Sequence, residues 1–200
     1  MNTKLIALAS GALLTAAALA GCTAGPAGDD GTGSMPGMNH TSHTPQASDA
    51  DHNQADVTFA MNMVAHHQQA IEMSDMLLAK QGVDPRVAEL AQAIKAAQQP
   101  EIDTMNGWLT GWGQKGDMGG MDMGDGMMSQ HDMAALKNAS AADASKLFLT
   151  QMIQHHQGAI EMATTESENG RATEAIALAK KIVTAQTAEI ATMKDLLARP

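Results

Sequence analysis

The sequence contains few cysteines, aromatic residues and basic residues, and each scarcity excludes a class of protein. One cysteine in 200 residues leaves no partner for an intramolecular disulfide, so packing must stabilise the fold. There is no tyrosine, and only two phenylalanines and two tryptophans are present, so Ala, Leu, Ile and Met must fill the core. This composition favours helices over strands. The formal net charge of −10 argues against nucleic acid as a partner and is compatible with cations.

The first 21 residues are typical of a secretory signal. Lys4 precedes an apolar run from Leu5 to Ala20, which is too short and too rich in alanine for a transmembrane helix. The run ends in Leu-Ala-Gly-Cys, which resembles the lipobox that directs cleavage before a lipid-modified cysteine in bacteria. An ordinary secretory peptide followed by a chance cysteine is the alternative. We expect lipidation at Cys22 and a domain in the cell envelope, anchored through lipid on the outer side of the cytoplasmic membrane or in the periplasm.

The mature chain divides into a tether and one domain. Residues 22–55 are rich in Gly, Ser, Thr, Pro and His and have too few apolar residues to fold, which predicts a flexible tether. Residues 56–198 are long enough to bury a core and are predicted to form a single domain.

An internal repeat organises this domain. The segment FAMNMVAHHQQAIEM, from Phe59 to Met73, matches FLTQMIQHHQGAIEM, from Phe148 to Met162, at an offset of 89. A second pair of matching segments begins at Ala91 and at Ala179, at an offset of 88. Each repeat is predicted to be a helical hairpin, so the two hairpins predict an all-α, antiparallel four-helix bundle.

Capping residues give the helix bounds. Gly82 can end the first helix, Asp84 and Pro85 are an N-cap and first-position pair, and Ser140 with Asp143 resembles a capping box. The predicted helices are 56–80, 85–109, 141–168 and 172–198, with no stable structure expected over 111–140. Pro100 lies inside the second helix and is expected to kink it.

Potential metal ligands recur at the same positions of both repeats. At about 100° per residue, the His pairs fall on or beside the buried face together with methionines, whereas Glu72 and Glu161 point to solvent. The candidates on the first and third helices are Met63, His66, His67, Met73, Met152, His155, His156 and Met162. Those on the apolar faces of the second and fourth are Glu101, Met105, Glu189 and Met193.

Two interpretations of these residues remain open. Buried carboxylates need partners, so each Glu can pair with a His in a structural hydrogen-bond network, with Met as a flexible core filler. Alternatively, Met sulfur, His nitrogen and Glu oxygen form a metal site. Thioether ligands select Cu(I) and its heavier analogue Ag(I), whereas harder cations require more carboxylates.

The segment between the hairpins favours metal binding. Its methionines stand among glycines and aspartates and cannot be core, so sulfur coordination is the property that distinguishes them from polar linker residues. The candidates are Met118, Met121, Met123, Met127, Met128 and His131, with Met133 nearby. Met35, Met38, His40, His43 and His52 repeat the pattern in the tether. A solvated low-complexity linker is the alternative.

The paired motifs HHQxAIEM and QxxEIxxM resemble those of the domain-of-unknown-function 305 family, which includes CopM-type periplasmic copper-binding proteins. The resemblance covers about residues 56–197 and both repeats. It implies a ferritin-like four-helix fold and binding of copper or silver through the Met and His positions. The Met-rich loop and the tether are variable additions, and Pro100 departs from the helical pattern.

Three functions compete at this point. The first is a metal-binding protein, not an enzyme, that sequesters Cu(I) or Ag(I), or exchanges it with a copper donor or acceptor protein, in copper tolerance or homeostasis. The second is a copper oxidase on a ferritin-like scaffold; a di-iron enzyme is disfavoured because the chain has no Glu-x-x-His motif. The third is a structural module whose His–Glu networks hold no metal.

Overall fold

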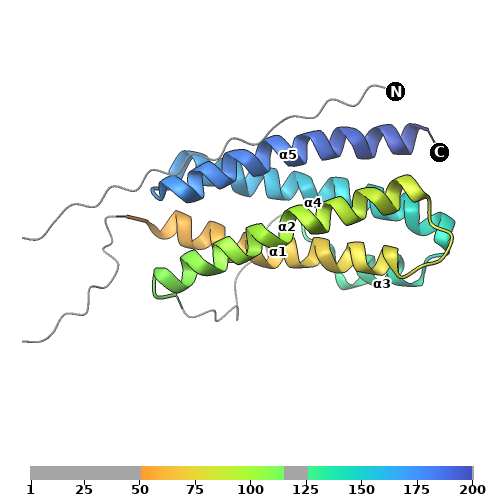
Figure 1. The fold of residues 1–200 in the computed structure, drawn as a ribbon, viewed down its shortest axis with the longest axis horizontal. Coiled ribbons are helices and arrows are strands. Elements are labelled where there is room, and N and C mark those ends of the chain that lie inside the picture. Colours follow the sequence, from red (N-terminus) through yellow and green to blue (C-terminus); the bar gives the residue numbers. More distant parts are fainter. Residues whose placement is uncertain (1–50, 115–125, 200) are drawn as a thin grey trace, which may run out of the picture. The chain divides into compact units, whose positions relative to one another are not determined.

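The computed structural model describes residues 51–114 and 126–199, and over these ranges the chain is helical with no strand. The helices in the described ranges are α1 (Gln54–Leu78), α2 (Pro85–Gly111), α3 (Gln130–Asn138), α4 (Ala141–Asn169) and α5 (Thr173–Ala198). The four long helices lie side by side, with α3 beside them (Figure 1). The predicted all-α four-helix bundle of two hairpins is confirmed. No helix in the described part of the chain combines the length and apolarity needed to cross a membrane.

Local capping chemistry starts the long helices where the sequence predicts. Asp84 caps α2 through Arg86 N–H, and Pro85 takes the first helical position, as expected. Ser140 caps α4 through Asp143 N–H. At the first helix the prediction was less accurate: α1 ends at Leu78, and Gly82 stands further on in the turn, where its φ of 81° suits glycine. Helix α2 continues through Pro100 as one helix.

The start of α1 lies earlier than predicted and is not part of a free tether. Asn53 is the N-cap of α1, and its side chain forms a capping box with Asp56. His52, grouped with the tether in the sequence, is 9% exposed and stacks on Trp112, with ring centroids 4.7 Å apart. The residues immediately before α1 are therefore fixed against the end of α2.

Each hairpin is tied to the other by one residue near the start of its first helix. Asp56 and Ser145 occupy equivalent positions in the two repeats, and each accepts backbone N–H groups from the turn of the opposite hairpin. The Asp56 carboxylate accepts from Arg171 at 3.0 Å and Ala172 at 2.8 Å. The Ser145 hydroxyl accepts from Asp84 at 3.1 Å. These two contacts fix the turns at opposite ends of the bundle.

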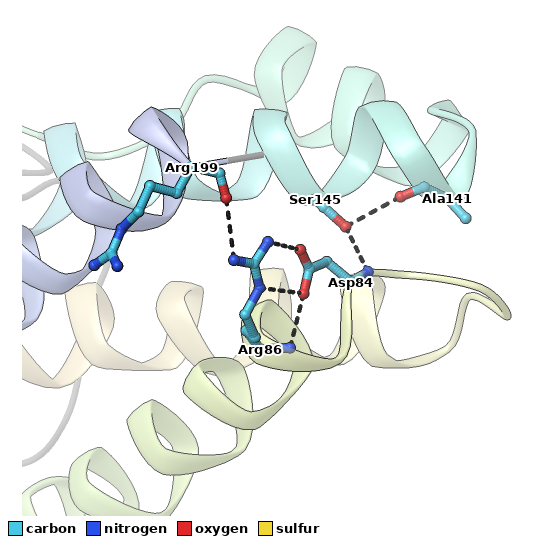
Figure 2. Close-up of polar contacts among 5 residues, drawn as sticks. All are labelled: Asp84, Arg86, Ala141, Ser145 and Arg199. Atoms are coloured by element: carbon cyan, nitrogen blue, oxygen red, sulfur yellow. Dashed lines mark hydrogen bonds and ion pairs between the residues drawn. The ribbon is translucent and has the colours of Figure 1, made fainter.

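Figure 2 shows the second of these contacts and the ion pair beside it. The Ser145 hydroxyl accepts from the Asp84 N–H and donates to the carbonyl of Ala141 at 3.2 Å. The Arg86 guanidinium donates to both carboxylate oxygens of Asp84, at 3.1 and 2.6 Å, and to the carbonyl of Arg199 at 3.0 Å. The turn before α2 is thereby linked both to α4 and to the end of α5.

At the opposite end of the bundle, Glu166 of α4 is 1% exposed and lies beside Asp56. Burial, followed by the hydrogen bond to Asp56 and its charge, raises the pKa of Glu166 to about 8. Burial alone would raise the pKa of Asp56, but hydrogen bonds from Glu166 and from backbone N–H groups lower it overall. Near pH 7 the pair therefore holds one proton, which Glu166 carries, and Asp56 is ionised.

Helix α3 corrects the prediction that residues 111–140 lack stable structure. Ser129 and Asp132 form a capping box at its start, and Leu136 is fully buried. The Gln151 amide of α4 donates to the carbonyl of Asp132 at 3.0 Å. Lys80, after α1, donates to the carbonyls of residues 137 and 139. A capping box, one apolar anchor and these bonds are sufficient to fix a short helix on the bundle.

Candidate functional site

Four histidines from the two repeats meet inside the bundle. His66 and His67 belong to α1, His155 and His156 belong to α4, and none is more than 1% exposed. The rings of His66 and His155 face each other, with centroids 3.6 Å apart and an angle of 39° between their planes. The repeats therefore bring their equivalent His pairs to one place at the contact between α1 and α4.

The outer histidine of each pair is hydrogen-bonded to a carboxylate of the same hairpin. His67 Nε2 lies 2.8 Å from Glu101 Oε2, and His156 Nε2 lies 2.7 Å from Glu189 Oε2. This is the pairing that the structural interpretation of the sequence expected. The two Glu side chains are 24% and 23% exposed, so they stand at the edge of the core rather than inside it.

The Glu contact also orients the histidine ring. A carboxylate accepts hydrogen bonds, so in a neutral ring Nε2 carries the hydrogen and Nδ1 presents its lone pair. Nδ1 of His67 and Nδ1 of His156 are both buried and have no hydrogen-bond partner. A carboxylate behind a histidine whose other nitrogen is free is the arrangement found where histidine binds a metal.

The inner histidines have no hydrogen-bond partner at either ring nitrogen. Both nitrogens of His66 and both of His155 are buried without one. Burial, followed by repulsion from His67 and His156, lowers the pKa of His66 to about 3. Burial, followed by repulsion from the neighbouring histidines, also lowers the pKa of His155 well below its usual value. Both rings are therefore neutral near pH 7, with a lone pair available on each.

Thioether sulfurs accompany each His–Glu pair. Met63 stands one turn before His67 on α1, and Met105 one turn after Glu101 on α2; both are fully buried. The second repeat places Met152 and Met193 equivalently, also fully buried. Met63 and Met105 share one apolar cluster of the core, and Met152 and Met193 share the other. Each hairpin thus carries its own set of two sulfurs, a histidine and a carboxylate.

The remaining predicted bundle residues are placed as follows. Met73 is fully buried in the cluster that contains Met152 and Met193. Met162 is only half-buried and lines a cavity of about 500 Å³. Glu72 and Glu161 are exposed, as expected.

Sequence reasoning left two buried amides out of the site. Gln98 on α2 and Gln186 on α5 are equivalent in the two repeats, and each is 3% exposed. Both amide polar atoms of Gln98, and the amide oxygen of Gln186, have no hydrogen-bond partner. The sequence did contain a sign of them, because Gln is the first residue of the repeated QxxEIxxM motif and lies on the same helix face as its Glu and Met.

The loop candidates separate into different environments. Met118, Met121 and Met123 lie outside the described residues. His131 belongs to α3, and its side chain is 93% exposed. Met127 and Met133 are half-buried. The expectation that no loop methionine can be core is wrong for Met128, which is 9% exposed and packs in an apolar cluster of the bundle.

The donors gathered in the bundle are soft and neutral. Among the described residues, no group of three or more His, Cys, Asp and Glu side chains is placed to hold a metal ion. The bundle instead brings together thioether sulfurs and imidazole nitrogens, uncharged at His66 and His155, and its two carboxylates are bound to histidine. Soft ligands of this kind suit monovalent copper and silver better than hard divalent cations.

The fold and the site together define a helical protein of the ferritin-like four-helix class. Each of its two repeats supplies an equivalent set of histidines and methionines to the interior. The chain belongs to the DUF305 family, described as a domain of unknown function, whose model matches residues 56–197. No match was found among proteins of curated function.

Solved structures of the family share the fold. A DUF305 fragment from Deinococcus radiodurans is 30% identical with a TM-score of 0.67, covering 74% of this chain and 98% of its own. A DUF305 protein from Streptomyces coelicolor, described as secreted, is 35% identical with a TM-score of 0.65, and the match covers 72% of this chain and 91% of the Streptomyces chain. CopM in its Cu(II)-bound form is 37% identical with a TM-score of 0.62, and the match covers 72% of this chain and 95% of the CopM chain. CopM has also been solved with Cu(I) and with Ag.

Proposed function

We propose that this protein binds Cu(I) or Ag(I) outside the cytoplasm, as a lipid-anchored protein that sequesters the ion or transfers it to a partner. CopM, which is similar over most of the described bundle, is a protein solved with copper and with silver. Localisation in the envelope rests on the signal-like segment that ends at Cys22. The protein holds metal and carries out no reaction on it, so the copper-loaded protein should consume no more dioxygen than an equal amount of chelated copper.

The observation that carries the proposal is the group of partnerless nitrogens at the contact of the two repeats. Leaving a buried polar atom without a hydrogen bond costs roughly 1–3 kcal/mol. His66 and His155 together bury four such atoms, and leucines of similar size would remove that cost. A purely structural core gains nothing from these histidines, whereas a soft metal ion would satisfy their lone pairs.

The geometry also supports a division between tight and weak binding. The His, Met and Glu of the bundle are held on rigid helices, so they bind few ions tightly. The sequence predicts that the Met-rich segment between the hairpins is a loop that loses conformational entropy on surrounding an ion, so its sites are expected to be weaker and more numerous.

The test replaces His66 and His155 with leucine. We expect the apo double variant to be as stable as the wild type or more stable, because it no longer buries partnerless nitrogens. Its Cu(I) affinity, titrated against a competing chelator, should fall at least tenfold in the tightest class. Thermal unfolding and affinity are measured on the same samples.

His131→Leu provides the matched control, because His131 is exposed on α3 whereas the four clustered histidines are buried. The control should retain the tightest class. A folded His66→Leu, His155→Leu variant that binds Cu(I) as tightly as the wild type would show that the cluster is structural.

A further inference from the structure

The two repeats differ at one position of their shared HHQxAIEM motif: the first has Gln69 and the second has Gly158. Each residue stands three positions after one of the two histidines that face each other, His66 or His155, and so lies one helical turn further along α1 or α4. The two repeats are therefore alike around the contact between His66 and His155 except at this position.

Gln69 binds the end of the Met-rich segment through both polar atoms of its amide. Its Oε1 accepts from the backbone N–H of Met128 at 2.7 Å, and its Nε2 donates to the carbonyl of Met128 at 2.9 Å. Both backbone hydrogen-bonding groups of Met128 are thus satisfied by one side chain 59 positions away in the sequence.

On the other side of the segment, the backbone of Gly126 packs against Gly158 of α4. The backbone of Gly126 lies so close to α4 that a Cβ on Gly126 would stand 2.8 Å from the Gly158 Cα and 3.0 Å from the carbonyl oxygen of Gln154. Gly126 also has a φ of 93°, which side-chain-bearing residues rarely adopt. Glycine at position 126 therefore allows the segment to approach the backbone of α4 this closely.

As a result, Met128 is more deeply buried than Met127, its neighbour in the segment. Its side chain is 9% exposed and lies in the apolar cluster that contains Met73, Met152 and Met193. Met127, one residue earlier, is half-buried and outside that cluster.

We infer that Met128 is a ligand of the tight bundle site, held there by Gln69 and by the packing of Gly126 on α4, rather than one of the weak ligands of the Met-rich segment. This inference rests on the proposed function. It makes Gln69 a positioning residue, and it makes Met128 the point at which an ion carried by the segment would pass to the bundle.

The docking is tested without metal by methionine oxidation. With hydrogen peroxide, Met128 should oxidise several-fold more slowly than Met127 in the wild type, as read by mass spectrometry of peptides. Gln69→Leu should raise the Met128 rate to that of Met127, because it removes both bonds to the backbone. Gln68→Leu is the matched control, since Gln68 is exposed on the adjacent position of α1. Equal rates for the two methionines in the wild type would overturn the docking.

The ligand role is tested by Cu(I) and Ag(I) titration of Met128→Leu and Met127→Leu. Leucine keeps the apolar volume of Met128 while removing the sulfur. Met128→Leu should weaken the tightest class about tenfold, and Gln69→Leu should weaken it in the same direction. Met127→Leu should leave the tightest class unchanged.

The outcomes separate this inference from the proposed function. If the wild type has no tight class, the proposed function fails while the oxidation result still reports on the docking. If the wild type binds tightly and Met128→Leu binds equally tightly, Met128 is not a bundle ligand and the inference is wrong.

Discussion

Glu166→Gln tests whether a shared proton joins the start of α1 to the turn between α4 and α5. Glu166 is 1% exposed and lies beside Asp56, and its pKa is raised to about 8 from an ordinary value of 4.5. The folded state therefore holds a proton that the unfolded chain releases near pH 4.5. This stabilisation is complete below pH 4.5 and is lost as the pH rises through 8.

The expected size follows from the linkage between proton binding and folding. Each pH unit inside this window costs up to about 1.4 kcal/mol, so the wild type should lose roughly 3 kcal/mol of unfolding free energy between pH 5 and pH 8. Glutamine keeps a donor for Asp56 but cannot ionise. Glu166→Gln should therefore be close to the wild type at pH 5 and clearly more stable at pH 8.

The assay is urea unfolding followed by circular dichroism at half-unit intervals from pH 5 to pH 8.5. Glu168→Gln is the matched control, since Glu168 lies on the same helix and is exposed. It should retain the wild-type slope. If Glu166→Gln also retains that slope, the carboxyl pair does not share a proton in the folded protein.

Two further predictions concern the outer histidines and the anchor. The double variant His67→Ala, His156→Ala should lose about 1–2 kcal/mol of stability per site, because each substitution leaves a partly exposed Glu unpaired. It should also bind the tightest class of Cu(I) more weakly. Unchanged tight binding in the folded variant would contradict the site. Radiolabelled palmitate should enter the wild type and not Cys22→Ala, and an unlabelled wild type would contradict lipidation.

The local sequence determined the helices and which side chains their buried faces carry. The repeat and the 3.6-residue period predicted both hairpins and placed both His pairs in the core, because helix formation and amphipathicity depend on short-range spacing. The N-cap at Asp84 was likewise predicted from the local sequence. Helix α3 was also locally encoded, by the Ser129 and Asp132 capping box and by Leu136, but the Gly- and Met-rich residues before it suggested a continuous loop.

Tertiary structure alone decided which of these side chains meet. The contact of His66 with His155 depends on how α1 packs against α4, which the spacing within either helix does not encode. Met128 is buried because Gln69, 59 residues away, binds its backbone. Glu166 resembles a surface residue in sequence, and the packing of the bundle buries it beside Asp56. Such contacts form between elements distant in the chain, so their energies depend on packing geometry and not on local sequence pattern.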